Sequence, residues 1–215
     1  MIKHSAYALG ATLYMPATRP DILEVVLGEK IQGLRSLVVC LEDAVAETDV
    51  QQGLNNLKNL LLGIEARGGR PSSGPILFVR PRDAAMAAVL NDWSLMRHVD
   101  GFVVPKLSLG NIREWQQAVT REDLMLMPTL ETADVFIPNA MVELRSAMLE
   151  LLPGRIIALR IGGNDLMGCL GLRRPQAMTL YSTPMSYVIP MLCGIMGSAG
   201  FAMTAPVFEQ LNAPH

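Results

Sequence analysis

The sequence is poor in the residues that several common catalytic and binding devices need. Only three of its 215 residues are histidines, and none of them closes a predicted strand, so a Ser-His-Asp or Cys-His device lacks its base. The adjacent glycines Gly162 and Gly163 lack the G-x-G-x-x-G spacing of a dinucleotide-binding loop. The net charge is -2, which excludes the basic field of a nucleic-acid-binding protein. An anionic ligand must therefore be bound by a few individually placed arginines.

Paired cysteines and membrane segments are also lacking. The three cysteines, Cys40, Cys169 and Cys193, lie far apart in apolar sequence, which favours a reducing, cytoplasmic setting over a disulfide framework or a metal-binding pair. The uncharged segment 187–206 has the length of a membrane span, but Pro190 and several glycines interrupt it. The apolar N-terminal stretch is interpreted as a first strand and not as a signal peptide. We therefore expect no membrane partner.

One unit recurs along the chain: a short apolar strand, then polar residues at its end, then a helical pattern. Seven candidate strands fit this unit, namely residues 10–16, 37–41, 76–83, 101–106, 124–131, 156–165 and 200–206. Helices are predicted within residues 18–34, 44–61, 111–119 and 134–152, and in the first of them Thr18 can be the cap and Pro20 lies in the first turn. Continuous apolar strands that alternate with helices predict an α/β protein with a parallel sheet.

The polar residues at the strand ends favour a barrel over an open sheet. They follow at least five of the predicted strands, and a doubly wound sheet would concentrate its site at one switch point. A (β/α) barrel instead collects residues from several strands around one mouth. We therefore predict a TIM-type (β/α)8 barrel that occupies residues 1–215 as a single domain.

An acid pair and an arginine are the first candidates for catalysis. Glu42 and Asp43 directly follow the apolar strand that ends at Leu41, where a buried charge needs a reason. Arg80 ends the next predicted strand, and its guanidinium could bind a carboxylate or stabilise negative charge on a carbonyl oxygen. The alternative is structural: the acid pair caps the next helix or forms ion pairs with Arg80. Both roles can hold together, because a carboxylate partner would fix the arginine.

Two further carboxylates are the candidate metal ligands. Glu131 and Asp165 end the fifth and sixth predicted strands, and a barrel would bring both to the same rim. Two carboxylates suit Mg2+, which keeps several waters and takes other ligands from an oxygen-rich substrate. The alternative is that Asp165 only caps a helix that begins at Leu166, and Glu131 one that begins near Asp134.

Lysine and arginine side chains complete the candidate substrate site. Lys106 follows the fourth predicted strand and could form a Schiff base with a carbonyl substrate, which is a rival mechanism. We expect it instead to pair with a carboxylate or a substrate oxygen. Arg19, just after the first predicted strand, joins Arg80 and Lys106 as a substrate-binding candidate.

Five motifs in register carry a family resemblance. They are LEDAV (41–45), VRPRD (79–83), GFVVPK (101–106), TLETA (129–133) and GGNDL (162–166). In this order they resemble the HpcH/HpaI aldolase/citrate lyase beta-subunit family over nearly the whole chain. The aldolase branch uses a histidine near the second strand, where this sequence has Cys40-Leu41-Glu42-Asp43, so the citrate-lyase-like branch is more similar.

The resemblance implies a Mg2+-dependent retro-aldol or retro-Claisen cleavage of a 3-hydroxy acid or its acyl-CoA thioester. It implies that Glu131 and Asp165 hold the metal and that Arg80 binds the oxo-acid or enolate oxygen. It further implies that Glu42 and Asp43 lie around the metal waters and the substrate. A metal and an arginine placed where negative charge develops would stabilise the transition state. A Mg2+/oxo-acid binding module without turnover is the non-enzymatic alternative.

The family also has a segment that the sequence lacks. Its members continue after the seventh strand with an eighth strand, whereas this chain ends at His215, after FEQLNAPH (208–215). An unclosed barrel would leave strand edges unpaired, so the sequence predicts a missing C-terminal βα unit and self-association into a homo-oligomer. The identity of the substrate does not follow from the sequence.

Overall fold

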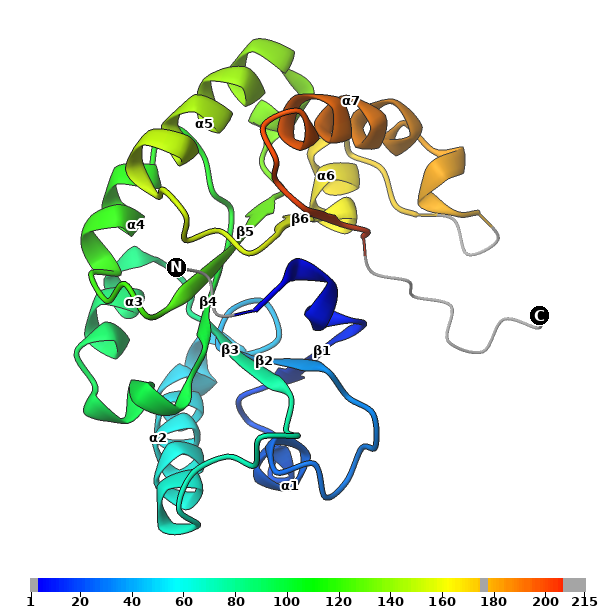
Figure 1. Cartoon of the computed structure of the whole chain (residues 1–215). Helices are drawn as coiled ribbons and strands as arrows, with labels where there is room; N and C mark the ends of the chain where they lie inside the picture. Colours follow the sequence, from blue (N-terminus) through cyan, green and yellow to red (C-terminus); the bar gives the residue numbers. More distant parts are fainter. Residues whose placement is uncertain (1–3, 175–177, 207–215) are drawn as a thin grey trace. The chain divides into compact units, whose positions relative to one another are not determined.

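The computed structural model describes residues 4–174 and 178–206. Its strands are parallel and are neighbours in the sheet in chain order, from β1 to β7 (Figure 1). The strands are β1 (Thr12–Pro16), β2 (Ser36–Cys40), β3 (Ile76–Arg80), β4 (Gly101–Val104), β5 (Met125–Leu130), β6 (Leu159–Ile161) and β7 (Met203–Thr204). A doubly wound sheet reverses its strand order at a switch point, whereas this order does not reverse. The seven predicted strands and the barrel topology are therefore confirmed.

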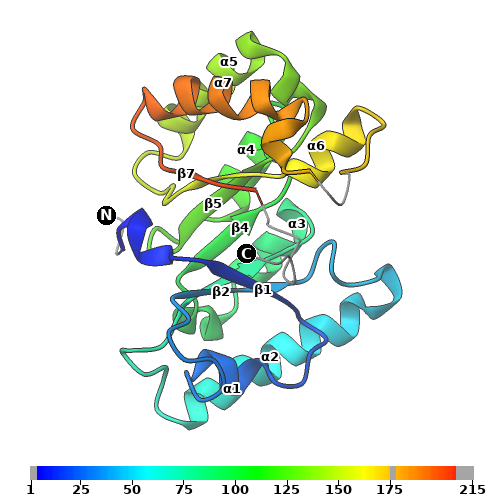
Figure 2. The same ribbon diagram turned by 90° about the vertical axis from the view of Figure 1, so that its right-hand side faces the viewer.

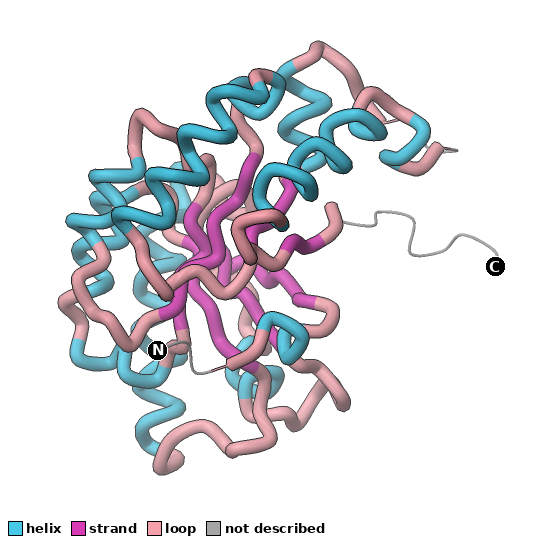
Figure 3. The backbone as a smooth tube through the Cα atoms, turned by 45° about the horizontal axis from the view of Figure 1, so that its top comes forward, coloured by secondary structure: helices cyan, strands magenta, loops and turns pink. Residues whose placement is uncertain are grey.

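Helices connect consecutive strands, as the tube drawing shows (Figure 3). The α-helices are α1 (Ile22–Val26), α2 (Val50–Ala66), α3 (Ala84–Asn91), α4 (Ile112–Ala118), α5 (Pro138–Leu151), α6 (Gly163–Cys169) and α7 (Met185–Gly197). Short 3-10 helices are η1 (Ala6–Leu9), η2 (Glu47–Asp49), η3 (Ser94–His98), η4 (Ala133–Phe136) and η5 (Leu180–Ser182). None of the helices in residues 4–174 and 178–206 is long and apolar enough to cross a membrane.

Two predicted helices differ from the structure. The first was expected within residues 18–34 but is only the five-residue α1, whose N-cap is Asp21, so the predicted cap at Thr18 and first-turn position of Pro20 are wrong. Gly28 has φ of 76°, a left-handed conformation that ends a helix. The second, predicted over 134–152, is divided into η4 and α5, because Pro138 starts a new helix and favours extended backbone before it.

The chain divides into two compact units. The first comprises residues up to 104 together with 114–126, and the second comprises 105–113 and the residues from 127 onward. The prediction of a single domain stays a prediction. The predicted lack of an eighth strand concerns residues after 206, which lie outside the described residues.

Three strands of the first unit are fully buried, whereas β1 is mostly half-buried. Every residue of β2, β3 and β4 is buried, which is typical of parallel strands covered on both faces. Level register brings the strand ends together, since Pro16 pairs with Cys40 and Cys40 pairs with Arg80. The helices α1 and α2 pack against each other beside β1 and β2 (Figure 2). The polar residues that follow β1, β2 and β3 therefore lie at the same edge of the sheet.

The second unit contains the ends of β5, β6 and β7. Thr129 pairs with Arg160, and Arg160 pairs with Thr204. The helices α5 and α7 pack against each other, and the Arg145 Nη1 donates to the Ile195 carbonyl oxygen at 3.3 Å. α7 runs through Pro190 and ends at Gly197, so the expected interruption of the segment at Pro190 is wrong. The strand predicted at the end of the segment is present as the short β7, but it is half-buried and not buried as expected.

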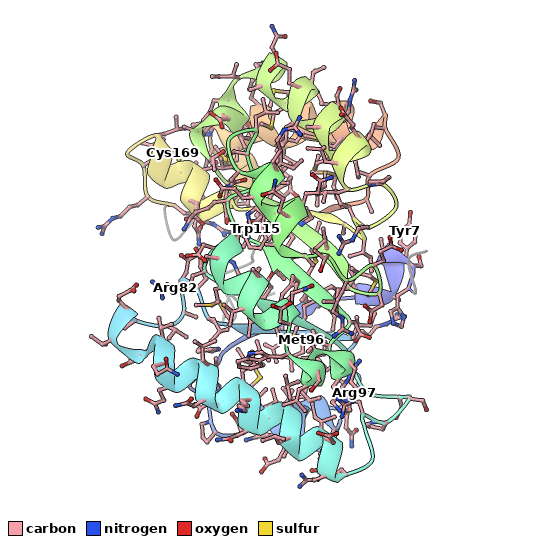
Figure 4. The ribbon with its side chains drawn as sticks, turned by 90° about the vertical axis from the view of Figure 1, so that its left-hand side faces the viewer. Tyr7, Arg82, Met96, Arg97, Trp115 and Cys169 are labelled. Carbon is pink, nitrogen blue, oxygen red and sulfur yellow. The ribbon has the colours of Figure 1, made fainter. Side chains whose placement is uncertain are left out.

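His98 lies in surroundings of the first unit that disfavour its charged form. It lies at the end of η3, which packs against α2, and Figure 4 shows Met96 and Arg97 on the same segment. The His98 Nε2 is buried and has no hydrogen-bond partner among the described residues. Burial, and secondarily the neighbouring Arg97, lowers the pKa of His98 below its usual value. The neutral form is therefore favoured in the folded state.

We expect the free energy of unfolding to fall as the pH drops below about 6.5, the usual pKa of histidine in an unfolded chain. Below this pH the unfolded chain binds a proton at His98 more readily than the folded protein does. Above this pH His98 is neutral in both states, and its contribution to the free energy of unfolding is fully present. Urea unfolding at pH 7.5 and 5.5 measures the effect, and His98→Gln should lose less stability between these pH values than the wild type. Equal losses in both proteins would contradict the assignment.

Candidate active site

The acid pair and the arginine come together at the end of β3. The Arg80 Nη2 lies 2.8 Å from the Glu42 Oε2, and its Nη1 lies 3.3 Å from the Asp43 Oδ2. Glu42 and Arg80 are 6% and 8% exposed, whereas the Asp43 side chain is about half exposed. A guanidinium this buried needs partners to offset desolvation, and two carboxylates supply them. The predicted ion pairs of Arg80 are therefore confirmed.

The segment that carries the acid pair is held in place by a second arginine. The Arg82 Nη1 donates to the Val45 carbonyl oxygen at 3.1 Å, and its Nη2 lies 2.6 Å from the Glu47 Oε2. The Asp43 backbone N–H also donates to the Glu42 Oε2 at 2.9 Å. Figure 4 shows Arg82 beside the start of α2. The Arg82 bonds thus hold the loop that follows the acid pair, and only the Asp43 N–H bond fixes the Glu42 carboxylate itself.

Arg19 lies in a different environment from Arg80. Its Nε and Nη2 donate to the two carboxylate oxygens of Asp21, at 2.8 and 2.7 Å, and the Lys30 Nζ lies 2.6 Å from the same carboxylate. The hydrogen bond from Arg19, followed by that from Lys30, holds the pKa of Asp21 well below its usual range. A cavity of about 380 Å3 lies beside Arg19, with Gln52, Asn56 and Asn59 in its lining. Arg19 thus borders a cavity of the first unit whose lining is partly polar and partly apolar.

Glu131 is a buried carboxylate directly after β5. It is 5% exposed, and its Oε1 accepts hydrogen bonds from the Thr129 hydroxyl at 2.6 Å and from the Lys106 backbone N–H at 3.0 Å. The N-cap of η4 is Thr132, so the alternative in which Glu131 caps this helix is wrong. These two bonds fix the position of the Glu131 Oε1.

Gly162 and Asp165 follow β6 beside this carboxylate. The Gly162 N–H donates to the Leu130 carbonyl oxygen at 3.1 Å, which extends the β5–β6 pairing to the residue before Glu131. A Cβ on Gly162 would lie 2.4 Å from both the Cβ and the Oε2 of Glu131. Gly162 is also the N-cap of α6, and Asp165 lies in the first turn of this helix. The alternative in which Asp165 only caps a helix that begins at Leu166 is therefore wrong.

Lys106 has an unusual backbone conformation and an unusual set of backbone hydrogen bonds. Its φ of 51° is the only positive φ of a non-glycine residue in 4–174 and 178–206. Such a conformation costs free energy and is found where the surroundings impose it, often at functional sites. Its side chain is exposed, and its backbone N–H points at Glu131 and Thr129. The backbone of Lys106 is therefore already part of the Glu131 environment.

The residues of the second unit fit a hard cation better than a transition metal. No group of three or more His, Cys, Asp or Glu side chains comes together in the described part of the chain. Transition-metal and zinc sites use several such ligands. Mg2+ is bound through one or two carboxylates with waters and substrate oxygens. Glu131, and Asp165 in the first turn of α6, are the carboxylates of the second unit that the sequence predicts for this role.

Sequence reasoning missed Thr129 and Gly162. Thr129 precedes Glu131 by two residues on one strand, so the period-2 alternation of a strand was the available signal. Gly162 lies in the GGNDL motif, but its close approach to Glu131 depends on the pairing of two strands that are distant in sequence. That approach is visible only in three dimensions.

The chain matches a known family along its length. The family model described as C-C bond lyase of the TIM-barrel fold matches residues 3–215. A comparison with curated proteins finds no match.

Solved structures of similar fold include the following three proteins. RipC from Yersinia pestis is 17% identical over 94% of this chain and 77% of its own, with a TM-score of 0.64. CitE from Mycobacterium tuberculosis, in complex with magnesium and acetate, is 18% identical over 97% and 78%, with a TM-score of 0.65. Haloferax volcanii malate synthase, as a magnesium/glyoxylate complex, is 16% identical over 93% and 64%, with a TM-score of 0.71. At sequence identities this low, the structural likeness shows a shared fold. The family match over residues 3–215 shows that the chain belongs to the C-C bond lyase family of the TIM-barrel fold.

Proposed function

We propose that the chain is a Mg2+-dependent carbon-carbon lyase, which cleaves a 3-hydroxy acid or its acyl-CoA thioester by a retro-aldol or retro-Claisen reaction. The family match supports the reaction class. The observation that carries the metal dependence is the buried Glu131 carboxylate, whose Oε1 is hydrogen-bonded to Thr129. Gly162, the N-cap of α6, lies beside this carboxylate, and Asp165 is in the first turn of the same helix. CitE with magnesium and acetate supports a small carboxylate ligand beside the metal, and malate synthase with magnesium and glyoxylate supports an oxo-acid in particular.

Arg80 has the charge that the cleavage needs. When the carbon-carbon bond breaks, its electron pair becomes an enolate, and the negative charge develops on a carbonyl oxygen. A guanidinium held by Glu42 and Asp43 is already desolvated and oriented, so it loses little in reorganisation when that charge appears. We assign Arg80 to this oxygen.

Carboxylates have the remaining roles. In a retro-aldol step the proton of the 3-hydroxyl group must be removed, and Asp43 is the half-exposed carboxylate that we assign to accept it. Glu42, which is buried on Arg80, orients the guanidinium. Glu131 and Asp165 would hold Mg2+, which when bound acts as a Lewis acid on the carbonyl oxygen.

We further propose that Lys106 and Arg19 contact the acidic end of the substrate. The three cysteines are free, which supports a reducing, cytoplasmic setting. α7 carries no charged residue and exposes Tyr187, a surface suited to association between copies of the chain. The working form would then be a homo-oligomer acting on a small-molecule oxo-acid or acyl-CoA partner.

Lysine chemistry remains the alternative mechanism. A Schiff-base lysine is activated by an apolar pocket or a neighbouring cation, whereas the Lys106 side chain is exposed. The carboxylates already provide for an electrophile, so a second device would be redundant. The observation that favours the alternative is the left-handed backbone of Lys106.

One assay tests both mechanisms. The purified chain is incubated with pyruvate, glyoxylate or oxaloacetate together with acetyl-CoA or propionyl-CoA, and products are followed by mass spectrometry in both reaction directions. We expect product with Mg2+, its loss on addition of EDTA, and its return when Mg2+ is restored. Turnover that resists EDTA, or no turnover on any substrate, would contradict the proposal.

The same samples are treated with borohydride to trap an imine. We expect no reduced adduct on Lys106, and we expect that borohydride does not lower turnover by reducing an imine. A reduced oxo-acid adduct on Lys106 would establish the Schiff-base mechanism instead.

A further inference from the structure

Thr129 forms a closed set of hydrogen bonds around one oxygen of Glu131. The Thr129 hydroxyl accepts from the Lys106 N–H at 3.1 Å and donates to the Glu131 Oε1 at 2.6 Å, while the same N–H lies 3.0 Å from that Oε1. Thr129 is 3% exposed and Glu131 5%. Since a residue and its second neighbour lie on the same face of a strand, β5 itself presents the hydroxyl to the carboxylate. Water cannot easily replace it.

These bonds occupy the Glu131 Oε1. A carboxylate oxygen has two lone pairs, and the hydroxyl and the backbone N–H supply two donors. The O–H···O bond is short because its acceptor is charged, and bonds of this kind are about twice as strong as neutral ones. Burial strengthens them further, because the local dielectric is low. A cation that needs the Oε1 as a ligand must therefore break at least one of them.

The position of the carboxylate is also confined. The left-handed Lys106, with φ of 51°, aims its N–H at the Oε1, so this donor is supplied by a strained and specific backbone conformation. On the other side, the Oε2 lies where a Cβ of Gly162 would be, at 2.4 Å. The carboxylate therefore has little freedom to turn and present both of its oxygens.

We propose that Thr129 makes this site selective for Mg2+ over Ca2+, because it reserves the Oε1 and leaves Glu131 as a ligand through one oxygen. Mg2+ takes single oxygens in near-octahedral geometry, whereas Ca2+ takes six to eight oxygens and commonly binds a carboxylate through both. The inference rests on the proposed role of Glu131 as a metal ligand. Thr129 is then a positioning and specificity-determining residue, not a ligand.

The test compares affinities for Mg2+ and Ca2+ by calorimetry on the full chain. Thr129→Val keeps the shape but removes the hydroxyl, and Thr129→Ser restores it. Thr132→Val is the matched control, because the Thr132 Oγ1 is also buried but has no hydrogen-bond partner among the described residues. Glu131→Gln reports on the metal site itself. Circular dichroism and thermal melting show whether each variant is folded.

We expect Thr129→Val to weaken Mg2+ binding about tenfold or more, the scale of losing a bond that orients a ligand. Its Ca2+ affinity should fall less or rise, so that the ratio of Mg2+ to Ca2+ affinity drops at least about fivefold. Thr129→Ser and Thr132→Val should keep the wild-type ratio. A general loss of packing would weaken both ions alike, so the ratio separates positioning from stability.

Two results would overturn the inference alone: Glu131→Gln abolishes Mg2+ binding while Thr129→Val keeps the wild-type ratio, or Thr132→Val changes the ratio as much as Thr129→Val does. A different result, unchanged Mg2+ affinity in Glu131→Gln, would overturn the metal site of the proposed function and this inference with it. Should Thr129→Val not fold, Thr129→Ser and Thr129→Cys are compared, and equal ratios in these two variants, despite the weak donor of the cysteine, would refute the role of the hydroxyl.

Discussion

Arg80→Lys is expected to raise the barrier of the cleavage by about 2 to 4 kcal/mol, the scale of removing one donor to a developing oxyanion. Lysine keeps the positive charge but not the planar fork with which Arg80 contacts Glu42 and Asp43 and still reaches a substrate oxygen. The loss should appear in kcat and in kcat/KM together, because the interaction is made mainly in the transition state. Steady-state kinetics under saturating Mg2+ measures it.

Arg82→Lys is the matched control. Arg82 lies two residues after Arg80, but its contacts are with Val45 and Glu47, so a change in kcat of less than about threefold is expected. Normal kcat with a raised KM in Arg80→Lys would reassign Arg80 to uniform substrate binding. Arg80→Ala is less informative, because it would leave a buried carboxylate without its partner and cost about 3 to 5 kcal/mol of stability.

Glu131→Gln and Asp165→Asn should each weaken Mg2+ binding about tenfold or more, which is at least the effect of losing a ligand's support. Both substitutions remove a negative charge at nearly constant shape, so the loss reports the charge and not the packing. Glu131 is buried and anchored through one oxygen, and Asp165 lies in the first turn of α6, whose N-cap touches that carboxylate. Isothermal calorimetry with MgCl2 measures the affinities.

Asp134→Asn serves as the control for charge in general. Asp134 lies in the first turn of η4, three residues after Glu131. Its charge should act on Mg2+ only through solvent-screened attraction, so Asp134→Asn should change the Mg2+ affinity by less than about twofold. Wild-type affinity in both Glu131→Gln and Asp165→Asn would refute the two-carboxylate site. An effect of the same size in Asp134→Asn would point to a diffuse electrostatic attraction instead.

Local sequence signals predicted the strands well and the helix ends poorly. Apolar runs such as Leu37–Leu41 mark buried parallel strands, because no solvent-facing alternation is required of them. The end of α1 was missed, since apolar spacing continues past Gly28 while the backbone there is left-handed. The break before α5 was missed although Pro138 signals it, because the apolar pattern runs across it.

The sequence identifies the site residues that follow the ends of strands. It does not identify the residues whose importance comes from contacts between neighbouring strands. Glu42, Asp43 and Arg80 stand out in sequence as charges in apolar surroundings, and their register in the sheet brings them together. Thr129 looks like an ordinary strand residue, and Gly162 looks like part of a loop. Their importance comes from distances to Glu131 that only the paired strands create.

The close approach at Gly162 also limits which substitutions this chain can accept. A Cβ at position 162 would meet the Cβ of Glu131, so the restriction depends on the separation of the two backbones and not on the carboxylate alone. A side chain at this position would require the start of α6 to move away from β5, and Asp165 would move with that helix. The absence of a side chain at position 162 therefore preserves the spacing of the two acidic residues.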